Sequence, residues 1–443
     1  MQRSFTPFRG LWRLAAWFFV LLPVWAALAI AEPVSKSDAR SPKTIPVWTR
    51  AALNTDEAGV LKASTDNFNR LQHRYKIELF SSNYRNYADW VKSVALTGGL
   101  PCLLEVDGPY VADFAWPGYL QPLDKFVSRD LRNDLLPSII AQGTYDGRLY
   151  TLGQFDSGLG LWANKRYLEM AGVRIPTVDA PWSLSEFEHI LVKLSSVKGV
   201  DYPLSMTVYA GMSEFYAYAY SPILQGFGGD LIDRKSYRTA HGVLDGPQSI
   251  AAMKRFQYWF KQGWTQPIFK RNDDFEKRRT ALSWTGHWKY PGYRKALGDD
   301  LILLPLPDFG HGIKTGMGSL SWAITSTCDA PEGAWAFLAY LMTPQEVLRM
   351  TNANGAVPAR KSALAESPLY GRDAPLNVYA QQLLHGHGVP RPAVPGYSTI
   401  SKSFSKAMSD IIAGNNVEAA LGKAADDIDA DIIARDPNSQ SRQ

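Results

Sequence analysis

Several motifs that carry chemistry are missing from this sequence. His-Glu-x-x-His does not occur, and residues 211–213 (Gly-Met-Ser) lack the final glycine of a nucleophile elbow. Residues 310–312 (Gly-His-Gly) do not continue as a phosphate-cradling glycine loop. The one close histidine pair, His385 and His387, has no further ligands in view, which favours a solvated loop over a metal site. The sequence offers no case for an enzyme, and we expect no metal and no cofactor.

Cysteine is scarce, and the charges are nearly balanced. Only Cys102 and Cys328 are present. An oxidising compartment would let them pair, whereas two buried free thiols would pack as small hydrophobes, and both alternatives stay open at this point. Without the three arginines of the amino-terminal segment, 44 basic residues face 42 acidic ones, a net charge of +2. The densest basic cluster, residues 277–279, is short, which argues against a nucleic-acid partner.

The amino terminus has the pattern of an export signal. Three arginines form a basic segment, residues 14–30 are almost entirely apolar, and Ala29 and Ala31 give the small-x-small pattern of a cleavage site. We therefore expect a signal peptide over residues 1–31, cleaved after Ala31, and a periplasmic protein. The alternative is an uncleaved anchor, because the apolar run approaches the roughly 18 residues that span a bilayer. No cysteine follows the run, so a lipoprotein is not expected.

Strand-like and helix-like segments alternate along the roughly 412 residues that would remain, a length that predicts two domains. The predicted strands include residues 45–48, 75–80 and 102–106, and predicted helices cover 60–71 and 89–96. This alternation favours an α/β fold with mostly parallel sheets. Two later helices are predicted to begin at capping boxes, at residues 183–186 (Ser-Leu-Ser-Glu) and 343–346 (Thr-Pro-Gln-Glu).

A series of short stretches then resembles a known family. In order, they are TGGLP (97–101), LLEVDG (103–108), GYLQPLD (118–124), GRLYTL (147–152), LWANKRYLEMAGV (161–173), GFGGDLID (226–233), AMKRFQYWFKQGW (252–264), LPLP (304–307), AITSTCDAPEGAWAFLAYLMTP (323–344) and GAVPAR (355–360). Each stretch alone is weak, but their shared order over residues 45–430 is specific. The chain resembles the family-1 extracellular solute-binding proteins, the group of the maltodextrin-binding protein. Cys102, Gly153, Ala163 and Leu184 depart from the family pattern, which has Asp, Pro, Tyr and Trp there.

The resemblance implies a two-lobed periplasmic-binding-protein fold (type II), each lobe a mostly parallel sheet flanked by helices. It implies a first lobe of residues 45–150 and 318–355, a second lobe of 155–312 and 365–430, and crossing segments at 151–154, 313–317 and 356–364. Ligand would bind in the cleft between the lobes, which close around it by a hinge motion. Both cysteines would belong to the first lobe, so a disulfide between them would not lock the hinge.

The resemblance also implies a function. It is that of the periplasmic component of an ABC transporter, a monomer that captures a sugar and delivers it to permease subunits in the inner membrane. One alternative ligand is a glycerol-phosphate or another polar solute, but few basic residues lie at the predicted strand ends. Another alternative is a secreted carbohydrate-active enzyme, whose carboxylates would have to face each other across a substrate. A sensory role beside transport is compatible with the sequence.

A sugar site needs flat aromatic rings and a few fixed hydrogen-bonding groups. Strand ends and crossing segments supply the candidates, which are Trp48, Asn83, Tyr84, Asp107, Tyr110, Phe155, Asp156, Tyr209, Trp284, Trp288, Gly318 and Ser319. Glu214, His287 and Arg360 lie near these positions and are further candidates. For the aromatic residues the alternative is ordinary packing, and for the others it is helix capping, hinge structure or a surface charge.

Overall fold

The computed structural model describes residues 41–51, 55–82, 87–208, 213–266 and 273–435. The expected signal peptide and its cleavage site lie outside these ranges, as do the candidate site residues Asn83, Tyr84 and Tyr209. None of the helices within the described ranges combines the length and the apolar character that a membrane span requires.

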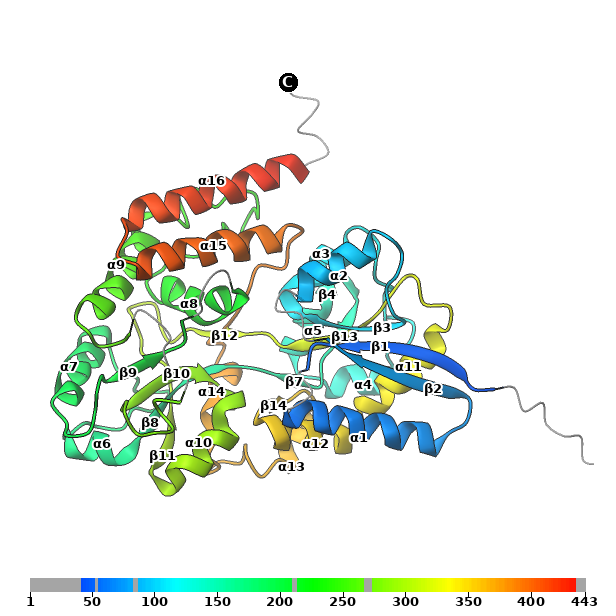
Figure 1. Cartoon of the computed structure of the whole chain (residues 1–443), viewed down its shortest axis with the longest axis horizontal. Coiled ribbons are helices and arrows are strands. Elements are labelled where there is room, and N and C mark those ends of the chain that lie inside the picture. Colours follow the sequence, from blue (N-terminus) through cyan, green and yellow to red (C-terminus); the bar gives the residue numbers. More distant parts are fainter. Residues whose placement is uncertain (1–40, 52–54, 83–86, 209–212, 267–272, 436–443) are drawn as a thin grey trace, which may run out of the picture. The chain divides into compact units, whose positions relative to one another are not determined.

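A five-stranded sheet carries what we call the first lobe (Figure 1). The strand order is β2 (Tyr75–Ser81), β1 (Lys43–Thr49), β3 (Leu103–Asp107), β13 (Leu320–Ile324) and β6 (Thr151–Leu152). Strand β1 runs parallel to β2 and β3, whereas β13 runs antiparallel to both of its neighbours. The alternating side chains Ile45 and Val47 of β1 are fully buried, which explains why the apolar pattern of this strand could be predicted.

A four-stranded sheet carries the second lobe, with the order β11 (Leu301–Leu304), β8 (Leu159–Asn164), β10 (Leu282–Gly286) and β9 (Leu204–Met206). Strand β8 is antiparallel to β10 and β11, and only β9 and β10 are parallel. The sheets are therefore mixed, and the expectation of mostly parallel sheets was wrong. In the first lobe the reason is the path of the chain, because β13 returns from the second lobe and so runs opposite to β3.

Helices flank both sheets. Those of the first lobe are α1 (Asp56–Leu71), α2 (Tyr87–Ala95), α3 (Val111–Ala115), α4 (Arg129–Asp134), α5 (Pro137–Gly143), α11 (Pro331–Leu341), α12 (Pro344–Asn354) and α13 (Lys361–Glu366). The others are α6 (Lys165–Met170), α7 (Leu184–Ser195), α8 (Glu214–Gly226), α9 (Pro247–Lys261), α10 (Tyr290–Leu297), α14 (Asn377–Leu384), α15 (Tyr397–Ile412) and α16 (Val417–Arg435). Short 3-10 turns complete the fold, namely η1 (Gly108–Tyr110), η2 (His287–Lys289) and η3 (Gly298–Asp300).

Both predicted capping boxes begin their helices. The hydroxyl of Ser183 accepts a hydrogen bond from the backbone N–H of Glu186, and Thr343 does the same for Glu346. The hydrogen bond from Arg174 lowers the pKa of the Glu186 carboxylate, and so does a hydrogen bond from the backbone of Ser183, as in a capping box. The buried Glu346 carboxylate accepts a hydrogen bond from Tyr340. Both helix starts lie where the sequence predicts them.

Paired strands lie where the chain passes between the lobes. Strand β7 (Phe155–Asp156) pairs with β14 (Val357–Pro358), and β12 (Thr315–Met317) pairs with β15 (Gly388–Pro390). The segment 356–364, where we expected a crossing, is bonded to the first lobe: the Ala359 carbonyl accepts from the Leu136 N–H, and Arg360 pairs with Asp134 at 2.6 Å. The next helix to contact a second-lobe strand is α14, which packs on β8.

The two cysteines form a disulfide, which decides between the alternatives that the sequence left open. Cys102 immediately precedes β3, and Cys328 lies between β13 and α11. Their Cα atoms are 4.3 Å apart, although 226 residues separate them in sequence. Both flanking strands belong to the sheet of the first lobe.

Candidate functional site

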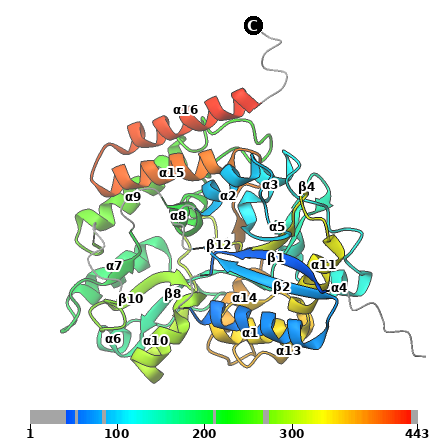
Figure 2. The same ribbon diagram turned by 45° about the vertical axis from the view of Figure 1, so that its right-hand side comes forward.

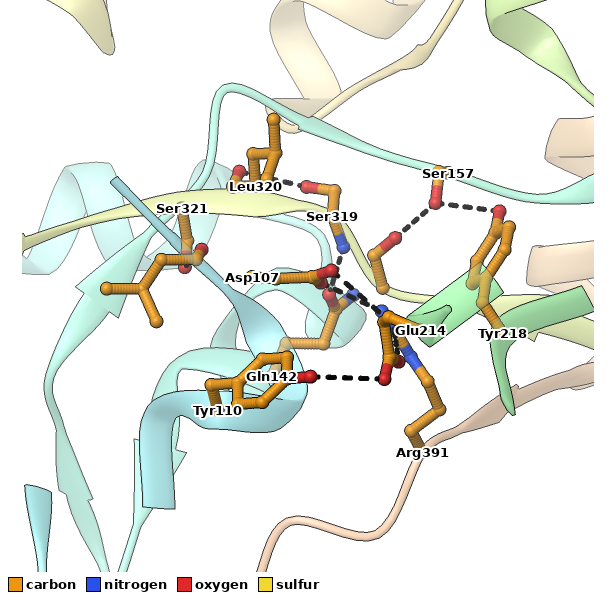
Figure 3. A network of polar contacts seen from close by, with 12 residues as sticks. Asp107, Tyr110, Gln142, Ser157, Glu214, Tyr218, Ser319, Leu320, Ser321 and Arg391 are labelled. Carbon is orange, nitrogen blue, oxygen red and sulfur yellow. Dashed lines mark hydrogen bonds and ion pairs between the residues drawn. The ribbon is translucent and has the colours of Figure 1, made fainter. Parts of the chain in front are cut away.

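A buried arginine lies where the two lobes meet. Arg391 follows β15 directly and stands between Pro390 and Pro392, whose rings restrict the backbone on either side. Its side chain is 3% exposed and enters between Asp107 and Glu214 (Figure 3). Nη2 lies 2.9 Å from Oδ1 of Asp107, and Nη1 bonds to Oε1 of Glu214 at 2.5 Å. One guanidinium therefore joins a carboxylate of the first lobe to a carboxylate of the second.

Secondary structure positions both carboxylates. Asp107 is the last residue of β3, and η1 follows it and carries Tyr110. Glu214 is the first residue of α8, whose amino terminus is capped by the hydroxyl of Ser213. The amino-terminal end of a helix favours a negative charge, so this is a suitable place for a buried glutamate.

Hydroxyl groups surround the Glu214 carboxylate. Tyr110 donates to Oε2 at 3.3 Å, Tyr397 donates to Oε1 at 2.5 Å, and Ser401 donates to Oε2. Burial raises the pKa of Glu214, while Arg391 opposes that rise. We call Asp107, Tyr110, Glu214, Arg391, Tyr397 and Ser401 the interlobe network.

Arg391 is also enclosed by groups outside this network. Its guanidinium carbon lies 5.0 Å from the ring centre of Tyr218, a cation–π distance. Gly318 has a φ of +122°, and a Cβ atom there would lie 2.7 Å from Nη2 of Arg391. The Nε atom is buried and has no hydrogen-bond partner among the described residues. The arginine is thus held in place, with one donor still to be satisfied.

Gln142 joins two segments that are distant in sequence, at Asp156 and Ser319. Its Nε2 donates to Oδ1 of Asp156 at 3.1 Å, and its Oε1 accepts from the N–H of Ser319 at 2.9 Å. The Asp156 side chain is fully buried, and burial raises its pKa. The Ser319 hydroxyl donates to the Phe155 carbonyl. Phe155, Asp156 and Ser319 therefore all take part in hydrogen bonds within the protein.

The two candidate tryptophans after β9 differ in their surroundings. Trp288 is 39% exposed, and its ring centre is 6.0 Å from that of Tyr218, which connects it to Arg391. Trp284 is 1% exposed, stacks on Phe309, and donates from Nε1 to the Ala219 carbonyl. Trp284 therefore lies in the core of the second lobe, and the structure does not bring it to the network.

Trp48 belongs to a separate aromatic group on the first lobe. Its ring stacks on Trp90 at 4.6 Å and lies 6.0 Å from Phe80, which is 47% exposed. Arg50, two residues further along the chain, contacts the network, because its Nη1 lies 3.6 Å from Oδ2 of Asp107.

Two of the three further candidates, His287 and Arg360, have structural partners. The buried His287 has its Nδ1 atom 2.8 Å from the Asn354 carbonyl, and burial lowers its pKa to about 4, so the imidazole is neutral. Arg360 pairs with Asp134 on the first lobe. Within the described ranges, no group of three or more His, Cys, Asp or Glu side chains is arranged to hold a metal ion.

Sequence reasoning missed Arg391, Tyr218, Tyr397 and Ser401. Tyr218 lies within a helix of continuous aromatic and apolar residues, where nothing marks one ring as special. Tyr397 and Ser401 lie one turn apart on α15, on the face that meets Glu214. The available signal was Arg391 itself, an arginine between two prolines directly after a short strand.

The comparisons with known proteins agree with this architecture. The GacH receptor of Streptomyces glaucescens, solved unliganded and with acarbose, superimposes with a TM-score of 0.74 at 20% identity, covering 87% of this chain and 97% of that one. The sugar-binding protein MalE of Xanthomonas citri gives 0.74 at 19% identity, covering 89% and 98%. In sequence, a maltotriose-binding protein of Pyrococcus abyssi is 22% identical over 334 residues, 72% of this chain and 68% of that protein.

The family comparison covers most of the chain. An uncharacterized lipoprotein of Streptomyces antibioticus is 22% identical over 348 residues, 72% of this chain and 71% of that protein. The model of the bacterial extracellular solute-binding proteins matches residues 63–376, well over half of the sequence. The two-lobed fold expected from the sequence is confirmed by the solved structures. The chain belongs to the bacterial extracellular solute-binding protein family.

Proposed function

We propose that this protein binds a neutral carbohydrate between its two lobes and delivers it to the permease of an ABC importer. It would act in the periplasm as a monomer, after cleavage of its signal peptide, and by binding alone, without turning the sugar over. The similarity to proteins named for maltotriose binding and sugar binding supports this ligand class.

The observation that carries the proposal is the chemistry around Arg391. Sugar hydroxyls both donate and accept hydrogen bonds, so side chains of either charge can bind them, and an aromatic side chain can cover the apolar face of a sugar ring. Asp107, Glu214 and Arg391 supply the charged partners, and the buried Nε of Arg391 is a donor without a partner among the described residues. Trp288 supplies an exposed aromatic ring beside Tyr218.

The same network argues against an anionic ligand. Arg391 carries one positive charge, and it is already paired with the carboxylates of Asp107 and Glu214. An added phosphate would lie beside two carboxylates, and like charges at such distances repel in a buried site. A neutral sugar adds no charge, so it fits the site better than a glycerol-phosphate.

The aromatic group around Trp48 supports an extended ligand. Phe80 in this group is 47% exposed, and its ring centre is 6.0 Å from that of Trp48. Arg50 follows β1 directly, two residues after Trp48, and its Nη1 atom lies 3.6 Å from Oδ2 of Asp107. We propose that a second sugar unit lies over this group, which favours an oligosaccharide over a monosaccharide.

Thermal unfolding in the presence of a ligand panel tests this function. The panel should contain neutral mono-, di- and trisaccharides, a uronic acid and glycerol 3-phosphate. At one hundred times Kd, a ligand adds about 2.7 kcal/mol to the stability. We expect stabilisation by a neutral sugar, stronger for two or three units than for one. Stabilisation by glycerol 3-phosphate alone would overturn the ligand class and leave the fold intact.

A further inference from the structure

A carboxylate of the first lobe caps a helix of the second. The side chain of Asp113, on α3, accepts hydrogen bonds from the backbone N–H of Gly396 at 2.6 Å and from the N–H and hydroxyl of Ser398 at 3.2 and 2.9 Å. Lys92 pairs with the same carboxylate at 2.5 Å and also bonds to the hydroxyl of Ser398. The Asp113 side chain is 1% exposed, and that of Lys92 is 28% exposed.

The capped helix is α15. Its N-cap residue is Gly396, which has no side chain to satisfy the free N–H groups of the first turn. Asp113 takes that role from 283 residues earlier in the chain. A negative charge at this end of the helix is also favoured by the helix dipole.

Helix α15 otherwise packs on the second lobe. Its buried residues Ile400, Phe404 and Met408 belong to the second-lobe core, and the helix lies against α8, α9 and α16. In Figures 1 and 2 its amino-terminal end lies beside α3. One further ion pair joins α15 to the first lobe, between Lys402 and Asp89 of α2 at 2.7 Å, with side chains that are 48% and 39% exposed.

The first turns of α15 carry two members of the interlobe network. Tyr397 and Ser401 both donate hydrogen bonds to Glu214, and Glu214 in turn holds Arg391. The contact that fixes the amino terminus of α15 against the first lobe is therefore next to the contacts that hold the proposed ligand site together.

The geometry points to Asp113 as a positioning residue that couples the approach of the two lobes to the assembly of the site. With the lobes together, Asp113 caps α15, and Tyr397 and Ser401 are presented to Glu214. With the lobes apart, α15 loses that cap, and Asp113 keeps only Lys92 as a partner. The coupling deepens the proposed function and rests on it, but the contact itself needs no ligand to form.

The test compares Asp113→Ala with Asp89→Ala. Small-angle X-ray scattering of the ligand-free proteins measures how far the lobes separate, and stopped-flow kinetics with the stabilising sugar measures dissociation. For Asp113→Ala we expect a larger radius of gyration and a Kd raised about tenfold, mainly through faster dissociation. Asp89→Ala removes a more exposed pair, between α2 and the same helix α15, and we expect it to leave both quantities unchanged.

Asp113→Asn covers the case in which the alanine variant does not fold, because the amide keeps the shape and one acceptor. We expect it to fall between wild type and Asp113→Ala in both measurements. A wild-type radius of gyration and dissociation rate in both Asp113 variants would overturn the proposal, and so would a lowered melting temperature with neither quantity moved. If the wild type bound no sugar, the proposed function would fail, yet the ligand-free scattering would still report on the contact.

Discussion

The guanidinium of Arg391 lies so close to Gly318 that a Cβ atom there would be 2.7 Å from Nη2. We expect Gly318→Ala to displace Arg391 from Asp107 and to raise the Kd for sugar about tenfold or more, because a charge-assisted hydrogen bond is lost. Titration calorimetry measures this change in Kd. Gly310→Ala is the matched control, since Gly310 has a similar φ of +113° and open space around it. Equal affinities in the two variants would show that the contact with Arg391 does not matter for binding.

Trp288 and Trp284 should respond in opposite ways to replacement by alanine. Trp288 is partly exposed beside Tyr218, so its loss should weaken sugar binding roughly threefold to tenfold and leave stability nearly unchanged. Trp284 is buried in the second-lobe core, and its loss should lower the unfolding free energy by about 3–5 kcal/mol. For both variants, calorimetric titration measures the Kd for sugar, and urea unfolding measures the free energy of unfolding. If Trp288→Ala were destabilised but bound sugar with normal affinity, Trp288 would have a role in packing and not in binding.

These two tryptophans also show what the sequence could predict. The segment from residue 282 to 288 is recognisable as a strand that ends in a turn, but both faces of β10 are buried, so alternation could not separate the core ring from the exposed one. Asp107 was predictable because it ends a buried strand, and Tyr110 lies three residues further on, in η1. Arg391 was not predictable, because its partner Asp107 lies 284 residues away and no local sequence pattern sets the distance between the two side chains. Strands, helices and caps follow local patterns, whereas the mixed sheets follow the path of the chain between lobes.

Stability should depend on pH through Glu105, which is buried beneath Thr49 in the first lobe. Burial raises the pKa of Glu105 from 4.5 to about 7, so the folded chain binds the proton more tightly than the unfolded chain does. The free energy of unfolding then falls as pH rises from 4.5 to 7, by about 3 kcal/mol at most. We expect Glu105→Gln to gain stability relative to wild type at pH 8 but not at pH 4.5.

His287 has the opposite slope, because its lowered pKa makes stability fall as pH drops from 6.5 towards 4. The two slopes overlap in the wild type, so the difference between wild type and Glu105→Gln at each pH is the informative quantity. Urea unfolding at pH 4.5 and 8 measures it, with exposed Glu366→Gln as the control. A difference that does not change with pH would contradict the raised pKa.

The disulfide should stabilise the first lobe without affecting ligand binding. It closes a loop of 226 residues that contains the whole second-lobe sheet, and long loops lose the most entropy on closure. Cys102→Ala combined with Cys328→Ala should lower the unfolding free energy by about 2–5 kcal/mol. Thermal and urea unfolding measure the loss, and calorimetry should return an unchanged Kd, because both cysteines lie outside the interlobe network. An unchanged free energy of unfolding would mean that the disulfide does little to restrict the unfolded chain.

Calorimetric titration of Arg391 variants tests whether a sugar binds around this residue. The stabilising sugar should bind wild type at one site per chain. Arg391→Lys keeps the charge but loses the fork that reaches Asp107 and Glu214 together, so Kd should rise at least about tenfold. Arg360→Lys, on the first lobe and paired with Asp134, should bind as wild type does. Equal affinity in wild type and Arg391→Lys would show that the sugar does not depend on Arg391 for binding.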